Sequence, residues 1–374
     1  MSIQPVLLWS DLFIWLLVIA VSACGLWSAR QPPVRVAWAR VARNRTGMAA
    51  ATLLAVFALI GLADSLHYRP QLPPKAGDAA DARPVYAIEV LSLLDALATP
   101  LRTRNEKTYS APLATRAYAK EMIEVRGSDG ALRTQRDFPR LRHGGAHLGA
   151  DEGHAGQDIM NRVLVALAVA GIVWGGLALL FTLGIARARR LAGPQAWRAL
   201  WRGGRADDTP AWNAVLVTLG ILCILVALIA APAGAYHVFG TDKVGQDVLY
   251  QVLKSIRTAL VIGLVTTLVT LPLGVVLGIV AGYFRGWVDD VIQYLYTTLN
   301  SIPGVLLIAA AVLMMQVLMD THPQWFATAA ERADLRLLAL CFILGLTSWT
   351  GLARLLRGEV MKLRELDYVQ AAQA

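Results

Sequence analysis

Asp242 and Asp247 could each accept hydrogen bonds from backbone N–H groups at the start of a helix. They lie in the segment FGTDKVGQDVLYQVLKSIRTAL, residues 239–260, in which Gly240 and Gly245 allow tight turns. The apolar residues after Asp247 recur at helical spacing: Val248, Leu249, Val252, Leu253 and Ile256. The pattern predicts a capped helix at the membrane surface that leads into a membrane span.

Three glycines spaced four residues apart, Gly274, Gly278 and Gly282, could form a groove that another helix approaches closely. Pro272 and Pro303 could kink the apolar segments that contain them. Two interpretations stay open. The groove is either ordinary helix packing or the wall of a transport path whose packing shifts between two states.

Patterns typical of catalysis and metal binding are missing from the sequence. Cys24, Cys223 and Cys341 fall inside apolar segments, so we interpret them as small buried hydrophobic residues and expect no disulfide framework. The histidines show no metal-ligand spacing, and no GxxxxGK[ST] phosphate loop occurs. The apolar segments carry no charged residue near their middle, unlike transporters driven by ion gradients. If the chain transports a solute uphill, the energy must come from a partner.

Composition indicates the elements that position these residues. Of 374 residues 56% are hydrophobic and only 16% charged, with a mean hydropathy of +0.51. Apolar runs of about 20 residues are typical of membrane helices. We predict seven such spans, at residues 6–28, 47–66, 161–184, 213–235, 258–283, 291–319 and 335–353. The predicted fold class is an all-α membrane protein, a polytopic helical bundle.

The net charge of +9 is concentrated in short loops rather than in a nucleic-acid-binding pattern. Residues 29–46 hold five arginines and no acidic residue, and residues 185–212 hold six arginines against Asp207 and Asp208. The positive-inside rule predicts that both loops are cytoplasmic. Alternation then places the N-terminus outside and residue 374 in the cytoplasm. Lys254 and Arg257 are expected to lie toward the lipid headgroups.

The chain has four predicted regions. Residues 1–66 hold the first two spans, and residues 67–160 form an extracytoplasmic segment, small and α+β or irregular, that opens with a linker-like stretch. Residues 161–212 hold the third span with its arginine-rich loop, and residues 213–374 hold the last four spans and a cytoplasmic tail.

Two weaker patterns concern the ends of the first and third spans. Residues 21–24, VSAC, resemble a lipoprotein cleavage site, but residues 1–10 contain no Lys or Arg, which favours a membrane span over a signal peptide. Residues 147–159 echo residues 237–248, and chance similarity and an internal repeat both remain open.

The tail after the last span reads ARLLRGEVMKLRELDYVQAAQA and predicts an amphipathic cytoplasmic helix. Its apolar stripe consists of Leu355, Leu356, Val360, Leu363 and Leu366. Ala371 and Ala372 would allow close approach to a partner's groove. The alternative is a helix on the membrane surface with no partner.

As an ordered set, these residues resemble inner-membrane permease subunits of binding-protein-dependent ABC importers, specifically the second permease of the dipeptide, oligopeptide and nickel branch. The resemblance covers about residues 213–374. The matching positions are Gly240-Thr241-Asp242, Gly245-Gln246-Asp247-Val248-Leu249, Arg257-Thr258-Ala259-Leu260, Gly282 to Asp289, Ile302-Pro303, Ala353-Arg354, Arg357-Gly358 and Asp367-Tyr368-Val369-Gln370-Ala371-Ala372.

The resemblance implies a type I ABC importer permease of the bacterial inner membrane that takes up peptides or similar small solutes by alternating access. Its implied partners are a second permease subunit in a heterodimer, two ATPase subunits and an extracytoplasmic solute-binding protein. It implies no cofactor on this chain, with ATP and Mg on the ATPases, and no catalytic residue. The implied ATPase-docking residues, in the EAA-type loop, are Asp367, Tyr368, Gln370, Ala371 and Ala372. The implied outer motif is Gly240, Thr241, Asp242, Gly245 and Asp247.

The sequence departs from the family pattern in four ways. Gln246 stands where arginine is usual, and Gln370 replaces the glutamate of the EAA loop. The first three spans and the outer segment are additional. The chain stops at Ala374, inside the expected docking loop and before two further spans, so we expect it to be truncated. The alternatives are a membrane scaffold or a secondary transporter, each with an outer binding flap.

Overall fold

The computed structural model describes residues 3–72, 85–126, 132–149, 152–203, 209–325 and 328–372. The linker-like stretch from residue 73 to residue 84, Asp151 of the suggested repeat, and Asp207 and Asp208 lie outside the described residues.

Seven helices in the described part of the chain are long and apolar enough to cross a membrane. They are α1 (Trp9–Ser28), α3 (Arg45–Asp64), α6 (Ala155–Arg189), α8 (Trp212–Ala233), α9 (Val248–Phe284), α11 (Gly304–Thr321) and α12 (Ala329–Arg364). Each overlaps one of the seven predicted spans, so the predicted helical membrane fold is confirmed.

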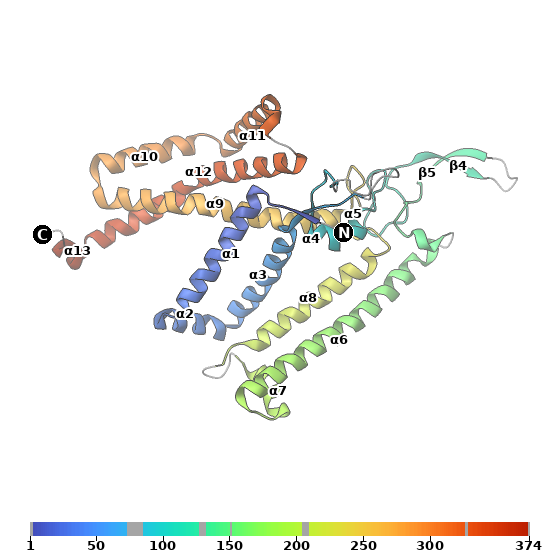
Figure 1. Cartoon of the computed structure of the whole chain (residues 1–374), viewed down its shortest axis with the longest axis horizontal. Helices are drawn as coiled ribbons and strands as arrows, with labels where there is room; N and C mark the ends of the chain where they lie inside the picture. Colours follow the sequence, from blue (N-terminus) through green and yellow to red (C-terminus); the bar gives the residue numbers. More distant parts are fainter. Residues whose placement is uncertain are drawn as a thin grey trace. The chain divides into compact units, whose positions relative to one another are not determined.

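The chain divides into two compact units (Figure 1). Unit 1 comprises residues 1–20, 65–93 and 257–374, and unit 2 comprises residues 21–64 and 94–256. The helices α1 and α9 each contribute to both units. The four regions predicted from the sequence remain predictions.

Unit 1 begins with a small antiparallel sheet in the order β1-β2-β3. The strands are β1 (Ile3–Val6), β2 (His67–Pro70) and β3 (Leu91–Ser92). Val6 pairs with His67, and His67 pairs in turn with Ser92. The sheet therefore joins segments that flank the first two membrane helices in the sequence.

The rest of unit 1 is helical. After α9 the chain turns sharply at Arg285 and Gly286, which have φ angles of 55° and 60°, and enters α10 (Gly286–Ser301). The short helices η3 (Pro323–Trp325) and α13 (Asp367–Ala371) precede and follow α12. Ala281, Ile292, Trp349 and Ala353 form a core where α9, α10 and α12 meet.

Pro303 was expected to kink a single span at residues 291–319, but the structure has two helices there. Ile302 is extended, with ψ 124°, and Pro303 stands at the start of α11. The proline ring disfavours helical geometry in the preceding residue, and the missing N–H removes a helical hydrogen bond. Pro272, in contrast, lies inside the continuous α9.

Unit 2 contains a helical part and the outer segment. The helices α6 and α8 run side by side, and α3 packs against α8 (Figure 1). The short helices α2 (Pro32–Arg43) and α7 (Gly193–Arg202) lie in the loops before α3 and between α6 and α8. Leu200 of α7 is buried with Ala178 and Leu216 in the core of this part.

The outer segment has the mixed character that was predicted. It contains α4 (Leu93–Leu97), α5 (Thr99–Arg102), η1 (Ala146–Leu148), η2 (Glu152–His154) and a hairpin of β4 (Glu121–Arg126) and β5 (Leu132–Asp137). The two hairpin strands are antiparallel, with Glu121 opposite Asp137.

Candidate coupling and outer recognition sites

The three spaced glycines of α9 lie against α12 within unit 1. A Cβ atom on Gly278 would be 2.8 Å from the carbonyl oxygen of Ala353. On Gly274 it would be 2.8 Å from a methyl carbon of Leu352, and on Gly282 it would be 2.8 Å from Cβ of Val360. A side chain at these positions would collide with α12, so the glycines allow the close packing of the two helices.

An ion pair links α12 to α10 in the same region. Arg357 Nε donates to Asp289 Oδ1 at 2.6 Å, and the Arg357 Nη2 donates to Oδ2 at 2.5 Å. Asp289 is only 6% exposed. The hydrogen bonds from Arg357 hold the pKa of the Asp289 carboxyl below its usual range. The carboxylate is therefore charged at neutral pH and fixes the orientation of the guanidinium.

The end of α12 is tied to the end of α9. Arg364 Nη1 donates to the carbonyl oxygen of Tyr283 at 2.8 Å. Arg285 and Glu365 form an ion pair with an N–O distance of 2.9 Å. These contacts fix where the chain leaves α12 and enters α13.

The expected ATPase-docking residues lie on or beside α13, and all of them are exposed: Asp367, Tyr368, Gln370, Ala371 and Ala372. Tyr368 is 68% exposed. The tail was expected to be one continuous amphipathic helix, but α12 ends at Arg364 and Leu366 is extended, with ψ 137°. The apolar stripe is also divided. Leu356 and Val360 pack on the glycines of α9, whereas Leu355, Leu363 and Leu366 are exposed.

The outer motif in unit 2 is a compact loop. Gly240 and Gly245 have φ angles of 73° and 81°, and a Cβ atom on them would lie 2.2 Å and 1.9 Å from the carbonyl oxygens of Ser110 and Glu106. Both positions therefore require glycine. Thr241 Oγ1 donates to the carbonyl oxygen of Thr108 at 2.8 Å, which ties the loop to the outer segment.

The two aspartates of this motif have different roles. Asp247 Oδ1 accepts the N–H of Leu249 at 2.8 Å and caps the start of α9. Asp242 Oδ1 accepts the N–H groups of Val244 and Gln246 at 2.9 and 2.8 Å, so it closes the loop instead of capping a helix. Burial alone would raise the pKa of Asp242, but hydrogen bonds from Gln251 and the backbone hold it below its usual value.

His237 joins the outer motif to the outer segment, a role that our sequence analysis missed. Its side chain lies between Asp247 Oδ2, at 2.7 Å from Nδ1, and Glu106 Oε1, at 3.4 Å from Nε2. His237 is 1% exposed. Burial favours the neutral ring, but the two carboxylates outweigh burial and raise the pKa of His237. Glu106 is 131 residues away in the sequence, so no local pattern could indicate the contact.

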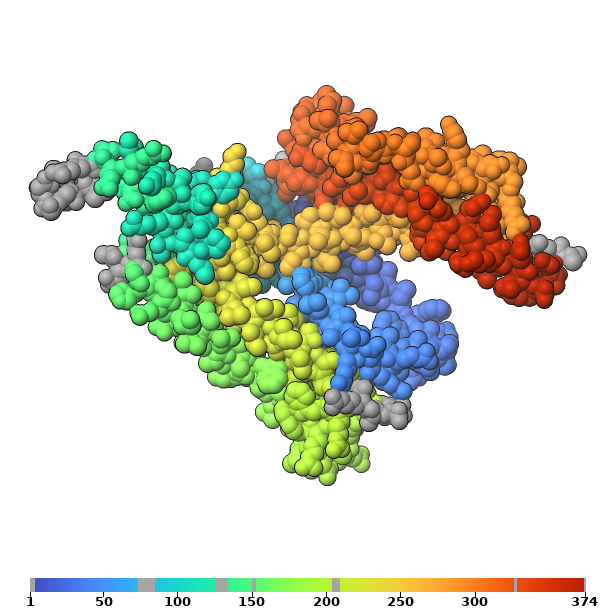
Figure 2. Space-filling view, turned by 180° about the vertical axis from the view of Figure 1, so that it is seen from behind, coloured from blue at the N-terminus to red at the C-terminus, as the bar shows by residue number. Residues whose placement is uncertain are grey.

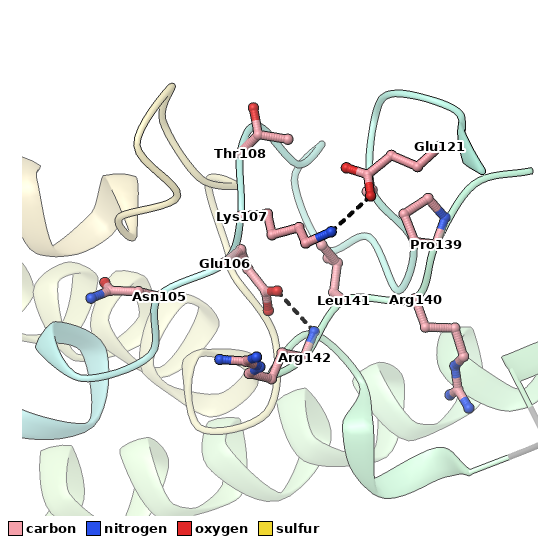
Figure 3. Close-up of a pocket in the computed structure, with 10 residues that line it drawn as sticks. Asn105, Glu106, Lys107, Thr108, Glu121, Pro139, Arg140, Leu141 and Arg142 are labelled. Carbon is pink, nitrogen blue, oxygen red and sulfur yellow. Dashed lines mark hydrogen bonds and ion pairs between the residues drawn. The ribbon is translucent and has the colours of Figure 1, made fainter. Parts of the chain in front are cut away.

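A cavity of about 290 Å³ with charged side chains in its lining lies beside Glu106 (Figure 3). Glu106 accepts the backbone N–H groups of Arg142 and His143 at 2.8 and 2.7 Å. Lys107 Nζ and Glu121 Oε2 form an ion pair at 2.9 Å across the cavity wall. The lining of the cavity therefore contains side chains of both charges, and two backbone hydrogen bonds hold the carboxylate of Glu106 in place.

The expectation that Lys254 and Arg257 lie toward the lipid headgroups stays a prediction, and the structure gives both side chains acidic partners. In unit 2, Lys254 Nζ lies 2.6 Å from Asp64 Oδ1 and 3.0 Å from Asp95 Oδ1. In unit 1, Arg257 is 11% exposed and its Nη2 lies 2.6 Å from Asp11 Oδ1. The carboxylates belong to segments far away in the sequence and provide partners that hydropathy patterns do not reveal.

The described residues contain no group of three His, Cys, Asp or Glu side chains that could hold a metal ion. Cys24, Cys223 and Cys341 are free thiols, but of the three only Cys341 is buried within the protein, whereas Cys24 is exposed and Cys223 half-buried. The region around α9, α12 and α13 and the region around the outer motif are both built by helix packing, capping and ion pairing. Such contacts can position segments and transmit movement.

Comparison with known proteins finds a family match in the C-terminal region. Residues 274–374 match the family described as "Binding-protein-dependent transport system inner membrane component". This range contains the glycine groove, the pair of Arg357 with Asp289, and the exposed residues of α13.

Curated relatives show similarity over part of their length. The chain is 27% identical over 142 residues to the oligopeptide transport system permease protein OppC of Mycobacterium tuberculosis, which covers 38% of this chain and 43% of that protein. It is 35% identical over 137 residues to OppC of Escherichia coli, covering 37% and 39% of the two chains. It is 27% identical over 223 residues to the glutathione transport system permease protein GsiD of Pectobacterium atrosepticum, covering 54% and 65%. The chain thus spans between about two fifths and two thirds of the length of these relatives.

Proposed function

From the membership of residues 274–374 in the family of binding-protein-dependent transport system inner membrane components, we infer that this chain is a transmembrane permease subunit of an ATP-driven importer. Its solutes are peptides or similar small molecules, as the names of the oligopeptide and glutathione permeases suggest for those relatives. The chain forms part of the translocation path, and separate ATPase subunits carry out ATP hydrolysis.

The observation that carries this proposal is the arrangement of the matched region. The groove of α9 receives α12, the pair of Arg357 with Asp289 fixes α12 to α10, and α13 follows directly with its side chains exposed. A rigid helix that ends in an exposed short helix suits the transmission of ATPase movement to the membrane. We propose that Asp367, Tyr368, Gln370, Ala371 and Ala372 contact the ATPase.

The outer motif has the complementary role in this proposal. Gly240, Thr241 and Asp242 shape a rigid loop that leads into α9, and the outer segment is anchored to that loop. We propose that an extracytoplasmic solute-binding protein docks here and that a second permease subunit completes the path. The chain lies in the bacterial inner membrane, with the arginine-rich loops and α13 in the cytoplasm.

The test co-expresses the chain with a candidate second permease and candidate ATPase subunits from the same organism. Ala371 and Ala372 are changed together to glutamate, and the ATPase that co-purifies in detergent is measured. We expect most of the ATPase to be lost and the second permease to be retained, because bulky charged side chains cannot fit a close helix contact. A matched control is Gly358→Ala, since a Cβ atom there would meet no atom within 4 Å. Unchanged ATPase recovery by the glutamate variant would overturn the assignment of the docking residues.

A further inference from the structure

Both arginine-rich loops contain an amphipathic helix. In α2, Val34, Ala37, Trp38, Val41 and Ala42 recur at positions i, i+3, i+4, i+7 and i+8 and so share one face. The arginines of α2 lie on the remaining faces: Arg35, Arg40 and Arg43. In α7 the apolar residues Ala196, Trp197, Leu200 and Trp201 likewise share a face opposite Arg198 and Arg202.

The two helices lie at the same end of unit 2. The N–H of Ala211, which follows the α7 loop, donates to the carbonyl oxygen of Ala42 in α2 at 2.8 Å. Arg45 at the start of α3 donates through Nη2 to the carbonyl oxygen of Gly203 at 3.3 Å. In Figure 2 the blue α2 and the yellow-green α7 are seen at this common end. Helices that connect the ends of membrane spans lie at the boundary of the bilayer.

The apolar face of α2 is largely uncovered by the described residues. Trp38 is 64% exposed and Val41 is 44% exposed, and α2 has no buried residue. The apolar face of α7 is more covered than that of α2. Ala196 and Leu200 are 0% and 1% exposed, while Trp197 is 43% exposed. The helix α7 is therefore anchored by protein contacts, whereas α2 offers tryptophan and valine to its surroundings.

A groove near the same end of unit 2 also combines apolar side chains with an arginine. It has a volume of about 520 Å³ and lies between the end of α6 and the start of α8. Its apolar lining includes Phe181, Gly184, Ala188 and Trp212, and Arg189 stands at its edge. A mostly apolar groove with an arginine in its lining suits one acyl chain and the phosphate to which it is joined.

We propose that the arginine-rich end of unit 2 binds anionic phospholipid. The headgroup phosphates are held by Arg35, Arg40 and Arg43 of α2 and by Arg189 beside the groove, and Trp38 enters the boundary between headgroups and acyl chains. Three observations select a lipid over a protein partner: the position at the ends of membrane spans, the combination of tryptophan with arginine, and the mostly apolar groove between α6 and α8. Charge complementarity selects an anionic headgroup over a zwitterionic one. The proposal does not depend on the transport function.

The experiment reconstitutes the whole chain in nanodiscs of phosphatidylcholine with and without phosphatidylglycerol, and native mass spectrometry counts the lipids that stay bound. The variant Arg35→Gln/Arg40→Gln/Arg43→Gln removes three charges from α2. We expect it to retain phosphatidylglycerol roughly tenfold less well, because each cation near an anionic surface contributes to binding. The variant Arg35→Lys/Arg40→Lys/Arg43→Lys keeps the charges and should retain most of the lipid.

A matched control removes the same charge elsewhere. Lys107, Lys120 and Arg136 are exposed cations of the outer segment, and their joint change to glutamine should leave phosphatidylglycerol retention unchanged. Equal retention by the α2 glutamine variant and the wild type, or equal retention of the two lipids by the wild type, would overturn the proposal.

A second measurement needs no variant and covers the case in which the glutamine variant does not fold. Electron paramagnetic resonance of spin-labelled lipids reports the fraction immobilised by the wild-type chain. We expect more immobilised phosphatidylglycerol than phosphatidylcholine, with the excess falling as ionic strength rises. An excess that salt does not reduce, or no excess, would contradict an electrostatic lipid site.

Discussion

The contact of Arg357 with Asp289 shows how a single residue holds the coupling region together. Two charge-assisted hydrogen bonds of 2.6 and 2.5 Å join α12 to α10 at a carboxylate that is nearly buried. The change Arg357→Ala removes the charged partner of that carboxylate and leaves it the hydrogen bond from Gln293. We expect the free energy of unfolding to fall by about 2 kcal/mol, the typical contribution of a hydrogen bond to a charged group. Reversible denaturation in detergent would measure it.

The matched control for this prediction is Lys362→Ala. Lys362 and Glu359 pair on the surface of the same helix, with side chains 73% and 56% exposed. Exposed pairs contribute little to stability, so this variant should unfold almost as the wild type does. Similar losses in the two variants would mean that the buried pair is not a specific anchor.

His237 makes the outer motif sensitive to pH. Its folded-state pKa is raised by Asp247 and Glu106, so the stabilisation is fully present below the unfolded-state value of about 6.5. It is lost as the pH rises through the raised folded-state value. We therefore expect the outer segment to become easier to cleave by added protease as the pH rises from mildly acidic to alkaline. The neutral variant His237→Gln should show a flatter dependence.

The neighbouring His143 acts in the opposite sense and must be separated from this effect. Burial lowers the pKa of His143, so its contribution is lost on acidification. The measurement is therefore repeated in a His143→Gln background, where the rise in cleavage with pH should remain. Its disappearance there would assign the pH dependence to His143 instead of His237.

At the scale of elements, the crossing of α9 with α12 depends on the absence of side chains. A Cβ atom on Gly278 would lie 2.8 Å from the Ala353 carbonyl oxygen and 2.9 Å from Cβ of Leu356. We expect Gly278→Ala to lower the free energy of unfolding by about 1–3 kcal/mol, as overpacking does. Gly263 is in the same helix with no atom within 4 Å of a Cβ atom. Gly263→Ala should be neutral, or more stable by up to about 1 kcal/mol. If both changes alter the free energy of unfolding equally, helix propensity and not the close packing of α9 on α12 determines the effect of Gly278→Ala.

The same elements show what a sequence reveals and what it does not. The seven spans were predicted because hydropathy is a local property of each segment. The break at Ile302 was interpreted as a kink, since a proline pattern alone does not distinguish a bent helix from two helices. The glycine spacing indicated a groove, but only the structure identifies α12 as the helix that fills it. The contacts of His237 with Glu106 and of Arg257 with Asp11 were missed because each joins segments more than a hundred residues apart.

At the scale of the whole molecule, the N-terminal segment is tied to α9 and α12, the helices that carry Arg257 and Asp334. Asp11 of α1 accepts from Arg257 Nη2 at 2.6 Å and lies 2.8 Å from Nδ1 of His67. The N–H of Ser10 donates to Asp334 Oδ2 at 2.9 Å, and the Ser10 hydroxyl is in contact with Asp334 Oδ1. Because Asp11 and Ser10 are both 0% exposed, these charges are paired inside unit 1. The helix α1 is thus held in unit 1 by directed polar contacts.

This anchoring predicts that the N-terminal segment stays with the rest of the chain after the backbone is cut. A specific protease site is inserted at residues 30–31, between α1 and α2, and a C-terminal affinity tag retains the larger fragment. We expect the N-terminal fragment to co-purify in detergent, because β1 pairs with β2 and Asp11 pairs with Arg257. Asp11→Ala leaves Arg257 buried with a missing partner, which typically destabilises a contact by about 3–5 kcal/mol. Recovery of the fragment should then fall severalfold.

The control Asp290→Ala removes an exposed carboxylate from α10 and should leave recovery of the fragment unchanged. If the Asp11 variant retains the fragment as well as the wild type does, the ion pair is not needed to hold α1, and the pairing of β1 with β2 and the contacts of Ser10 with Asp334 suffice.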